Sequence, residues 1–200
     1  MQEAILHLKG SDPILSEIID RVGEYRIEFR DPDFETLVKS IVYQQLSGRV
    51  ASVIFERLRR AVKGSVTPQA ILKLRPSRMR TLGLSGQKTA YIRDLARHTR
   101  DGAVVFEELD GLADLDVIER LTKVKGIGVW TVHMFLIFAL RRHDVLPVGD
   151  LGIRNAIRRA YHLQELPTPA EMEQIAARWR PYCTVASWYL WRSLEPNANL

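Results

Sequence analysis

One short stretch constrains the fold of this chain more than any other, because two helical patterns meet there at a turn that holds two glycines. It reads Leu-Thr-Lys-Val-Lys-Gly-Ile-Gly-Val-Trp-Thr-Val and covers residues 121–132. Before the turn, Leu115, Ile118 and Leu121 recur every three residues, which is the spacing of one face of a helix. The pattern predicts a helix that stops near Val124.

The chain returns to a helical pattern directly after the glycines. From Val129 to Arg142 the apolar residues leave almost no polar face, which predicts a buried helix. Gly126 and Gly128 supply a permissive backbone, and their missing side chains let another backbone or a phosphate come close. The sequence therefore predicts a helix-hairpin-helix over about residues 114–142.

Such a turn has a chemical use. Backbone N–H groups at the start of the second helix lack partners within the helix, and together with the helix dipole they form a site for a phosphate oxygen. Lys123 and Lys125 add positive charge beside it. A Gly-x-Gly turn is also typical of two packed helices that bind nothing, so the turn alone leaves both interpretations open.

The rest of the chain is also helical in pattern. Residues 4–30 predict one or two helices, a helix from Phe34 continues past Gly48 with a bend there, and another runs from Leu151 to His162. No segment alternates with a period of two, which a half-buried strand would require. We therefore predict an all-α protein.

Residues 84–90 echo the hairpin. Leu-Ser-Gly-Gln-Lys-Thr-Ala aligns in register with residues 126–132, so a second hairpin is open, in which Lys88 would stand where the first has its tryptophan. The first glycine is absent, however, and a turn between two helices is the favoured interpretation. In that case we expect Lys88, Arg93 and Arg97 to face solvent or a distant phosphate.

Composition sets outer bounds. The 200 residues, 46% of them hydrophobic, suffice for one domain or two small ones with a real core. The net charge is +5, the isoelectric point is near 9.5, and 22 of the 29 basic residues are arginine. This balance favours a polyanionic partner, although a basic solvated surface would give the same numbers.

Two further expectations come from what the sequence lacks. Cys183 is the single cysteine, which excludes an internal disulfide and a four-cysteine zinc or iron–sulfur site. No apolar run is long enough for a signal peptide or a membrane span. We expect a cytoplasmic protein.

The motifs together carry a resemblance. Lys-Gly-Ile-Gly-Val-Trp-Thr, followed by Leu-Pro-x-x-Asp at residues 146–150, resembles the helix-hairpin-helix superfamily of DNA base-excision glycosylases, in particular the alkylated-base branch of 3-methyladenine DNA glycosylase II. The similarity extends from about Phe34 to Trp191. It implies a two-lobed helical bundle, with one lobe of residues 32–142 and a second of residues 1–31 plus 143–200, and an active cleft between the lobes.

The resemblance assigns catalysis to Asp150. By sequence alone this residue is a good N-cap for the helix that follows, and the two roles are compatible. Donors at a helix N-terminus stabilise an ionised carboxylate. A negative charge of this kind stabilises the oxocarbenium-like deoxyribose that forms as the base departs, or activates a water.

The resemblance also gives Trp130 a role. Without that context, a tryptophan at the start of a buried helix is more typical of a core. Relatives that cleave the strand through a Schiff base carry a lysine at this position, so a tryptophan here implies hydrolysis by water and no lyase activity. An indole face also suits a flipped cationic base through stacking and cation–π attraction.

Other residues follow from the same resemblance. Gln45 corresponds to the residue that fills the gap left by the flipped nucleotide, with its neighbour Leu46 as the alternative and a plain surface position as the ordinary interpretation. The remaining predicted substrate-binding residues are Trp191, Met134 and Tyr43, and the DNA-binding residues are Gln45, Lys123, Lys125, Gly126, Ile127, Gly128 and Thr131. The resemblance requires no cofactor and no catalytic metal, and it allows a monovalent cation bound by backbone carbonyls of the hairpin.

The function implied is a monofunctional DNA glycosylase. It would act as a monomer on double-stranded DNA, associate with the nucleoid when at work, and excise cationic alkylated bases such as 3-methyladenine and 7-methylguanine. Two alternatives remain at this stage: a glycosylase for an oxidised or mismatched neutral base, and a non-catalytic hairpin module that only binds DNA. Asp150 and Trp130 argue against the module, because non-specific binding needs neither residue.

Overall fold

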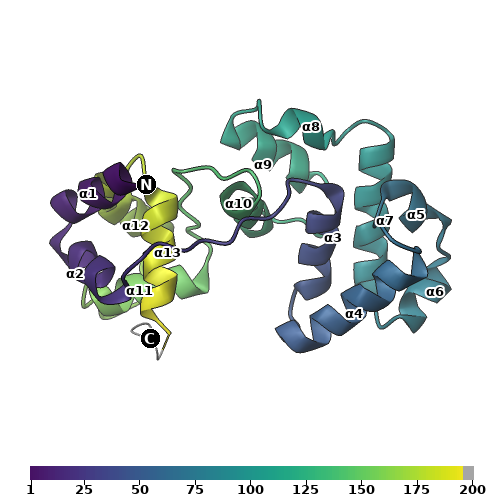
Figure 1. Cartoon of the computed structure of the whole chain (residues 1–200), viewed down its shortest axis with the longest axis horizontal. Helices are drawn as coiled ribbons and strands as arrows, with labels where there is room; N and C mark the ends of the chain where they lie inside the picture. Colours follow the sequence, from purple (N-terminus) through teal and green to yellow (C-terminus); the bar gives the residue numbers. More distant parts are fainter. Residues whose placement is uncertain (196–200) are drawn as a thin grey trace. The chain divides into compact units, whose positions relative to one another are not determined.

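The computed structural model describes residues 1–195, and this part of the chain holds thirteen α-helices, one 3-10 helix and no strand. The all-α prediction is confirmed. The chain forms two compact units, residues 30–135 and residues 1–29 together with 136–200, so the second boundary falls inside a helix. Figure 1 labels the helices of both units. None of the described helices combines the length and the apolar character needed to cross a bilayer.

The unit of residues 30–135 is organised around one long helix. Its helices are α3 (Phe34–Tyr43), α4 (Gly48–Ala61), α5 (Pro68–Lys73), α6 (Pro76–Thr81), α7 (Gly86–Arg100), α8 (Phe106–Leu109), α9 (Asp114–Thr122) and most of α10 (Val129–Phe138). Helix α7 packs on α3, α5 and α6, as Figure 1 shows. Ile92, Leu95 and Ala96 of α7 are fully buried in this packing. Burial of one apolar stripe therefore fixes the centre of the unit.

Arg93 corrects an expectation drawn from the sequence. Its Nη1 donates to the backbone oxygens of Ile71, Leu72 and Leu74, at 3.4, 3.4 and 2.7 Å. These carbonyls lie at the end of α5, where a helix leaves oxygens unpaired and favours a cation. Arg93 therefore caps α5 and does not face solvent.

The other unit has its core around the C-terminal helix. It contains α1 (Gln2–Ser11), α2 (Pro13–Val22), the end of α10, α11 (Leu151–Ala160), α12 (Pro169–Ala176), the 3-10 helix η1 (Ala177–Trp179) and α13 (Cys183–Ser193). Helix α13 packs on α2 and α11 and is buried over its first eight residues. The largest fully buried side chains of the unit are Trp179 in η1 and Tyr189 in α13.

A buried carboxylate ties the start of α2 to this core. Asp12 is fully buried, and its Oδ1 accepts from the backbone N–H groups of Ile14 and Leu15 as an N-cap. Its Oδ2 accepts from the indole N–H of Trp179 at 2.8 Å and from the hydroxyl of Tyr161. Every polar contact that a buried carboxylate needs is thus supplied within the unit.

Three predicted helix boundaries were wrong. The bend expected at Gly48 is a full break, because Gln45 adopts a left-handed φ of 55° between α3 and α4. Helix α10 ends at Phe138, not Arg142, and Arg141 likewise has a φ of 55°. Helix α11 ends at Ala160, before His162 with a φ of 53°. A non-glycine residue in the left-handed region cannot continue a right-handed helix, and apolar periodicity does not reveal it.

Candidate nucleic-acid interface and catalytic carboxylate

The hairpin turn joins α9 to α10 and is closed by its own backbone. The N–H of Val124 donates to the carbonyl of Leu121, and the N–H of Ile127 donates to the carbonyl of Val124, both at 3.1 Å. The Ile127 side chain is buried, so it anchors the turn in the core of the unit of residues 30–135. The predicted helix-hairpin-helix is present, with its first helix ending at Thr122.

The two glycines of the turn serve different purposes. Gly126 has a φ of 83°, and a Cβ placed there would lie 2.0 Å from Cδ2 of Tyr91, so the Tyr91 ring on α7 occupies the space that a side chain would need. A Cβ on Gly128 would meet nothing within 4 Å. Gly126 is therefore required by packing, whereas Gly128 leaves the backbone open to a ligand.

Asp94 on α7 holds the turn from the same side. Its Oδ2 accepts from the backbone N–H of Lys125 at 3.0 Å, and its Oδ1 accepts from Arg97 at 3.2 Å. Burial raises the pKa of the Asp94 carboxyl, but the bonds from Lys125 and Arg97 and the nearby His98 outweigh burial and lower this pKa overall. Asp94 is thus an ionised acceptor that fixes the backbone of the turn.

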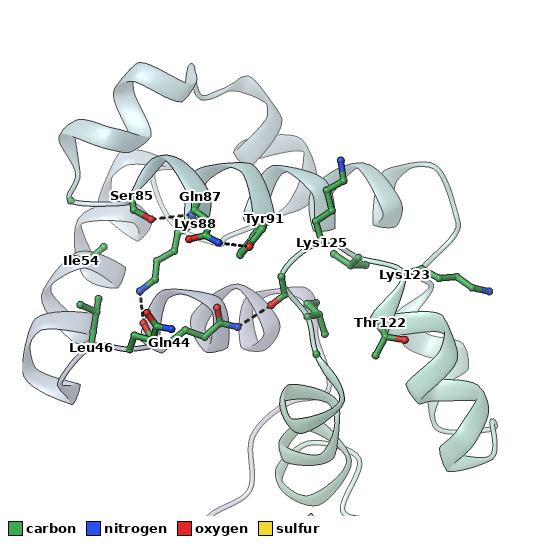
Figure 2. Close-up of a pocket in the computed structure, with 16 residues that line it drawn as sticks. Gln44, Leu46, Ile54, Ser85, Gln87, Lys88, Tyr91, Thr122, Lys123 and Lys125 are labelled. Atoms are coloured by element: carbon green, nitrogen blue, oxygen red, sulfur yellow. Dashed lines mark hydrogen bonds between the residues drawn. The ribbon is translucent and has the colours of Figure 1, made fainter. Parts of the chain in front are cut away.

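A groove of about 790 Å³ runs beside the turn and is shown in Figure 2. We call it the hairpin groove. Its lining comes from three segments of one unit: Gln44, Gln45, Leu46 and Ile54; Gly83, Ser85, Gln87, Lys88 and Tyr91; and residues 122–128. The Gln44 side chain bridges two of these segments, because its Nε2 donates to the carbonyl of Gly126 at 3.0 Å.

Lys88 points into this groove, which corrects the expectation that it faces solvent. Its Nζ donates to the carbonyls of Val42 and Gln44, both at 2.7 Å. Burial lowers the pKa of the Lys88 ammonium group. The segment around it joins α6 to α7, and Ser85 caps α7 by accepting from the N–H of Lys88 at 3.1 Å. It is a turn between helices, with Lys88 used as a donor to the end of α3.

The predicted DNA-binding side chains do not all face outward. Gln45, Lys123 and Lys125 are exposed, and Lys123 pairs with Glu119 at 2.9 Å. In Figure 2 the two lysine ammonium groups point away from the bond between Gln44 and Gly126. Thr131 is buried, as Ile127 is, so only the backbone atoms of these two residues are available to DNA.

The predicted substrate-binding residues lie on several different helices. Trp130, the second residue of α10, is 45% exposed, and Met134 one turn later is half-buried. Tyr43 lies in a separate polar groove, where the Lys39 ammonium group sits 5.7 Å from its ring centroid. The structure therefore places Tyr43 away from the groove beside the hairpin.

Asp150 is the N-cap of α11, as the sequence predicts. It is 8% exposed, and its Oδ1 accepts from the N–H of Ile153 and from the indole N–H of Trp191, both at 2.9 Å. The Trp191 ring stacks on Phe138, with centroids 5.8 Å apart and planes at 23°. Trp191, predicted as a pocket aromatic, thus also holds the carboxylate.

Gly152 makes this arrangement possible, and sequence reasoning missed it. A Cβ there would lie 3.0 Å from Asp150 Oδ1 and 3.2 Å from Trp191 Cδ1. Contacts this short leave no room for a side chain without displacing the carboxylate or the indole. The residues missed at the hairpin are Gln44, Tyr91 and Asp94, because the contacts they make depend on helix packing that no local motif encodes.

Two hairpin carbonyls are acceptors within the protein. Gly126 accepts from Gln44, and Val124 accepts from the N–H of Ile127. Each carbonyl oxygen has a second lone pair. A monovalent cation at the hairpin stays a prediction.

Comparisons with known proteins identify the family of the chain. Residues 38–181 match the model of the HhH-GPD superfamily of base excision DNA repair proteins. The chain is 36% identical over 200 residues to DNA-3-methyladenine glycosylase 1 of Schizosaccharomyces pombe, covering 96% of this chain and 87% of that protein. The resemblance read from the motifs is confirmed: the chain belongs to the HhH-GPD superfamily of base excision DNA repair proteins.

Solved structures give the same picture. An S. pombe 3-methyladenine DNA glycosylase in complex with abasic DNA superposes with a TM-score of 0.84 at 36% identity, covering 95% of each chain. A DNA-3-methyladenine glycosidase from Bacillus halodurans gives a TM-score of 0.86, also at 36% identity, covering 94% of this chain and 88% of that one.

Proposed function

We propose that this protein is a DNA glycosylase that removes alkylated, cationic bases such as 3-methyladenine and 7-methylguanine from duplex DNA. The observation that carries the proposal is Asp150, a carboxylate fixed at a helix N-terminus by two donors on one oxygen. Two relatives that are 36% identical bear the name DNA-3-methyladenine glycosylase, one of them as putative, and a 3-methyladenine DNA glycosylase at the same identity was solved in complex with abasic DNA, the product of such a reaction.

The proposed chemistry needs little from the enzyme besides a fixed negative charge. A base that carries a positive charge leaves as a neutral molecule, so no general acid is required. As the glycosidic bond lengthens, positive charge develops on the deoxyribose, and the Asp150 carboxylate stabilises it. Ile153 and Trp191 donate to Oδ1, which fixes the orientation of the carboxylate before the substrate binds.

The hairpin supplies the grip on DNA in this proposal. Gly128 leaves the backbone at the start of α10 open, where amide donors and the helix dipole suit a phosphate. The exposed indole of Trp130 offers a face on which a flipped cationic base stacks. We infer that the protein acts as a monomer on DNA of the nucleoid.

Strand cleavage is not part of the proposed reaction. A lyase needs an amine that attacks the sugar, and Trp130 stands where related lyases carry one. Three lysines line the hairpin groove. Lys88 donates to two carbonyls and so contributes to holding the end of α3, and Lys123 pairs with Glu119. Water is therefore the nucleophile.

A panel of duplexes, each with one defined lesion, tests the proposal. We expect release of 7-methylguanine and 3-methyladenine, strands that break only after alkali treatment, and no DNA adduct when borohydride is present during turnover. Preference for 8-oxoguanine or a mismatched neutral base would support the oxidised-base alternative. Binding without release of any base would support the non-catalytic module.

A further inference from the structure

We propose that Gln44 is a positioning residue that couples Gln45, the residue predicted from the sequence to fill the gap left by the flipped nucleotide, to the phosphate-binding turn. This inference rests on the proposed function. Extrusion of a base needs two things held at a fixed separation: a side chain that enters the stack, and an anchor on the backbone beside it. In this unit Gln44 lies between the two, adjacent to Gln45 in sequence and bonded to the turn at Gly126.

The bond from Gln44 joins segments that are far apart in the chain. Its Nε2 donates to the carbonyl of Gly126, 82 residues away, at 3.0 Å. The carbonyl belongs to the same turn whose other glycine, Gly128, faces open space. Figure 2 shows the bond spanning the hairpin groove from the end of α3 to the turn. Any shift of the Gln44 backbone relative to the turn would break it.

The backbone beside Gln44 is in a conformation that needs support. Gln45 has a φ of 55°, which a residue with a side chain adopts only at an energetic cost. Such conformations persist where the surroundings determine them, and they cluster at functional sites. Gln45 is also exposed, so its own side chain is not what holds it there.

Lys88 provides the second support. Its Nζ donates to the carbonyls of Val42 and Gln44, both at 2.7 Å, and so fixes the last turn of α3 from α7. The Gln44 carbonyl is held by Lys88 while its side chain holds Gly126. Gln44 is thus held at two points. The bond from Lys88 fixes the backbone next to Gln45, and the bond to Gly126 links this backbone to the hairpin turn.

The coupling has a functional consequence that a purely structural bond would lack. If Gln44 acts by presenting Gln45, then its loss should matter only where a base must be pushed out of a paired stack. Its loss should also matter only while Gln45 has a side chain to present. Both conditions can be measured.

The experiment compares Gln44→Met, Gln45→Ala and the double variant in single-turnover excision of 7-methylguanine. Methionine has a similar length but no donor. The lesion is placed either in a full pair or opposite an abasic site, where extrusion is already easier. The matched control is Gln69→Met, because Gln69 is exposed on α5 of the same unit and lines no part of the hairpin groove.

We expect Gln44→Met to slow excision from the full pair by about tenfold and excision opposite the abasic site by less than about threefold. The double variant should be no slower than Gln45→Ala alone, which is the signature of coupled sites. Gln69→Met should leave both rates unchanged. Lys88→Met, which removes the second support, should show the same dependence on pairing.

Two results would overturn the inference. Equal losses in both contexts would make Gln44 a merely structural residue, and independent, multiplying losses in the double variant would separate it from Gln45. Wild-type protein that releases no base from any duplex would instead refute the proposed function. Melting temperatures of all variants show whether a loss of rate reflects unfolding.

Discussion

The starts of α10 and α11 use the same backbone chemistry in opposite ways. At α11 the Asp150 carboxylate accepts from the helix N-terminus itself, through the N–H of Ile153. At the turn before α10 no side chain stands on Gly128, and a Cβ there would meet no atom within 4 Å. One helix start is filled by a protein carboxylate, and the other faces open space.

The residues that support the two sites also differ in whether they contact the functional group itself. Asp150 is enclosed by residues that contact the carboxylate itself: Trp191 donates to it, and Gly152 makes room for both. The hairpin turn is held by Tyr91, Asp94 and Gln44, which contact Gly126 and Lys125, while a Cβ on Gly128 would meet no atom within 4 Å.

This difference follows from what each site has to do. A charge that stabilises a transition state must be fixed before the substrate arrives, because reorientation during the reaction would cost part of the stabilisation. A phosphate site must instead stay open on the side where the DNA backbone arrives. The hairpin turn meets the second requirement, because its supports contact Gly126 and Lys125 and leave the backbone at Gly128 open.

The largest effect should come from Asp150→Asn. Asparagine is as good an N-cap as aspartate, and its Oδ1 can accept from Ile153 and Trp191 as the carboxylate does. The charge is lost, so we expect excision of 7-methylguanine to fall by several orders of magnitude, on the scale of about 3–5 kcal/mol of transition-state stabilisation. Single-turnover rates and melting temperatures of both proteins check this.

Asp33→Asn is the matched control for that experiment. Asp33 caps α3 in the same way, accepting from the N–H of Thr36 at 2.8 Å. The substitution removes one charge from a helix N-terminus without touching Asp150, so excision should be unchanged. If Asp33→Asn lowered excision as much as Asp150→Asn does, loss of negative charge in general would explain both results. Equal rates for wild type and Asp150→Asn would exclude Asp150 from the mechanism.

A smaller effect is expected from substitutions at Gly126 and Gly128. They test whether the backbone of the hairpin turn is open to a phosphate at Gly128. Gly128→Val has room in the free protein, so stability should change little, while the side chain blocks the phosphate and weakens binding roughly tenfold or more. Damaged and undamaged duplexes should lose affinity by similar factors, because phosphate contacts carry no base information. Titrations at fixed salt measure both affinities.

Gly126→Ala should show the opposite pattern. Its Cβ would overlap the Tyr91 ring in a backbone conformation that alanine disfavours, which costs about 1–3 kcal/mol of folding stability for overpacking alone. Thermal unfolding separates the two variants. A Gly128 variant that melts early with unchanged DNA affinity would reverse the assignment of the two glycines.

The sequence was informative where short-range chemistry decides the structure. Gly126 and Gly128 between two apolar patterns predicted the hairpin, and the Asp150 cap followed from one residue before a helical pattern. Both signals are local, since a turn needs a permissive backbone and a helix start needs an acceptor. The all-α class followed from periodicity in the same way.

The sequence was uninformative where a contact spans helices. Lys88 and Arg93 looked like solvated cations, yet both donate to carbonyls at the ends of other helices. Tyr91 looked like an ordinary helix residue, although it determines why Gly126 has no side chain. Such contacts depend on the packing of α7 against α3 and α5, which no spacing within one segment encodes.

The smallest expected effect is a pH dependence at Asp94. Its pKa is lowered in the folded protein by the bonds from Lys125 and Arg97, despite burial. A lowered folded pKa means that the stabilisation is complete above the unfolded value of about 3.9 and is lost as pH falls through the folded value. Between pH 5 and 8, stability should therefore not depend on this group.

Wild type should lose stability below about pH 4 more steeply than Asp94→Asn, which keeps an acceptor but cannot titrate. Urea unfolding of both proteins from pH 7 to pH 3 measures the difference. Parallel curves for the two proteins would mean that the Asp94 charge does not support the hairpin, and that the bond to Lys125 would hold equally well with a neutral acceptor.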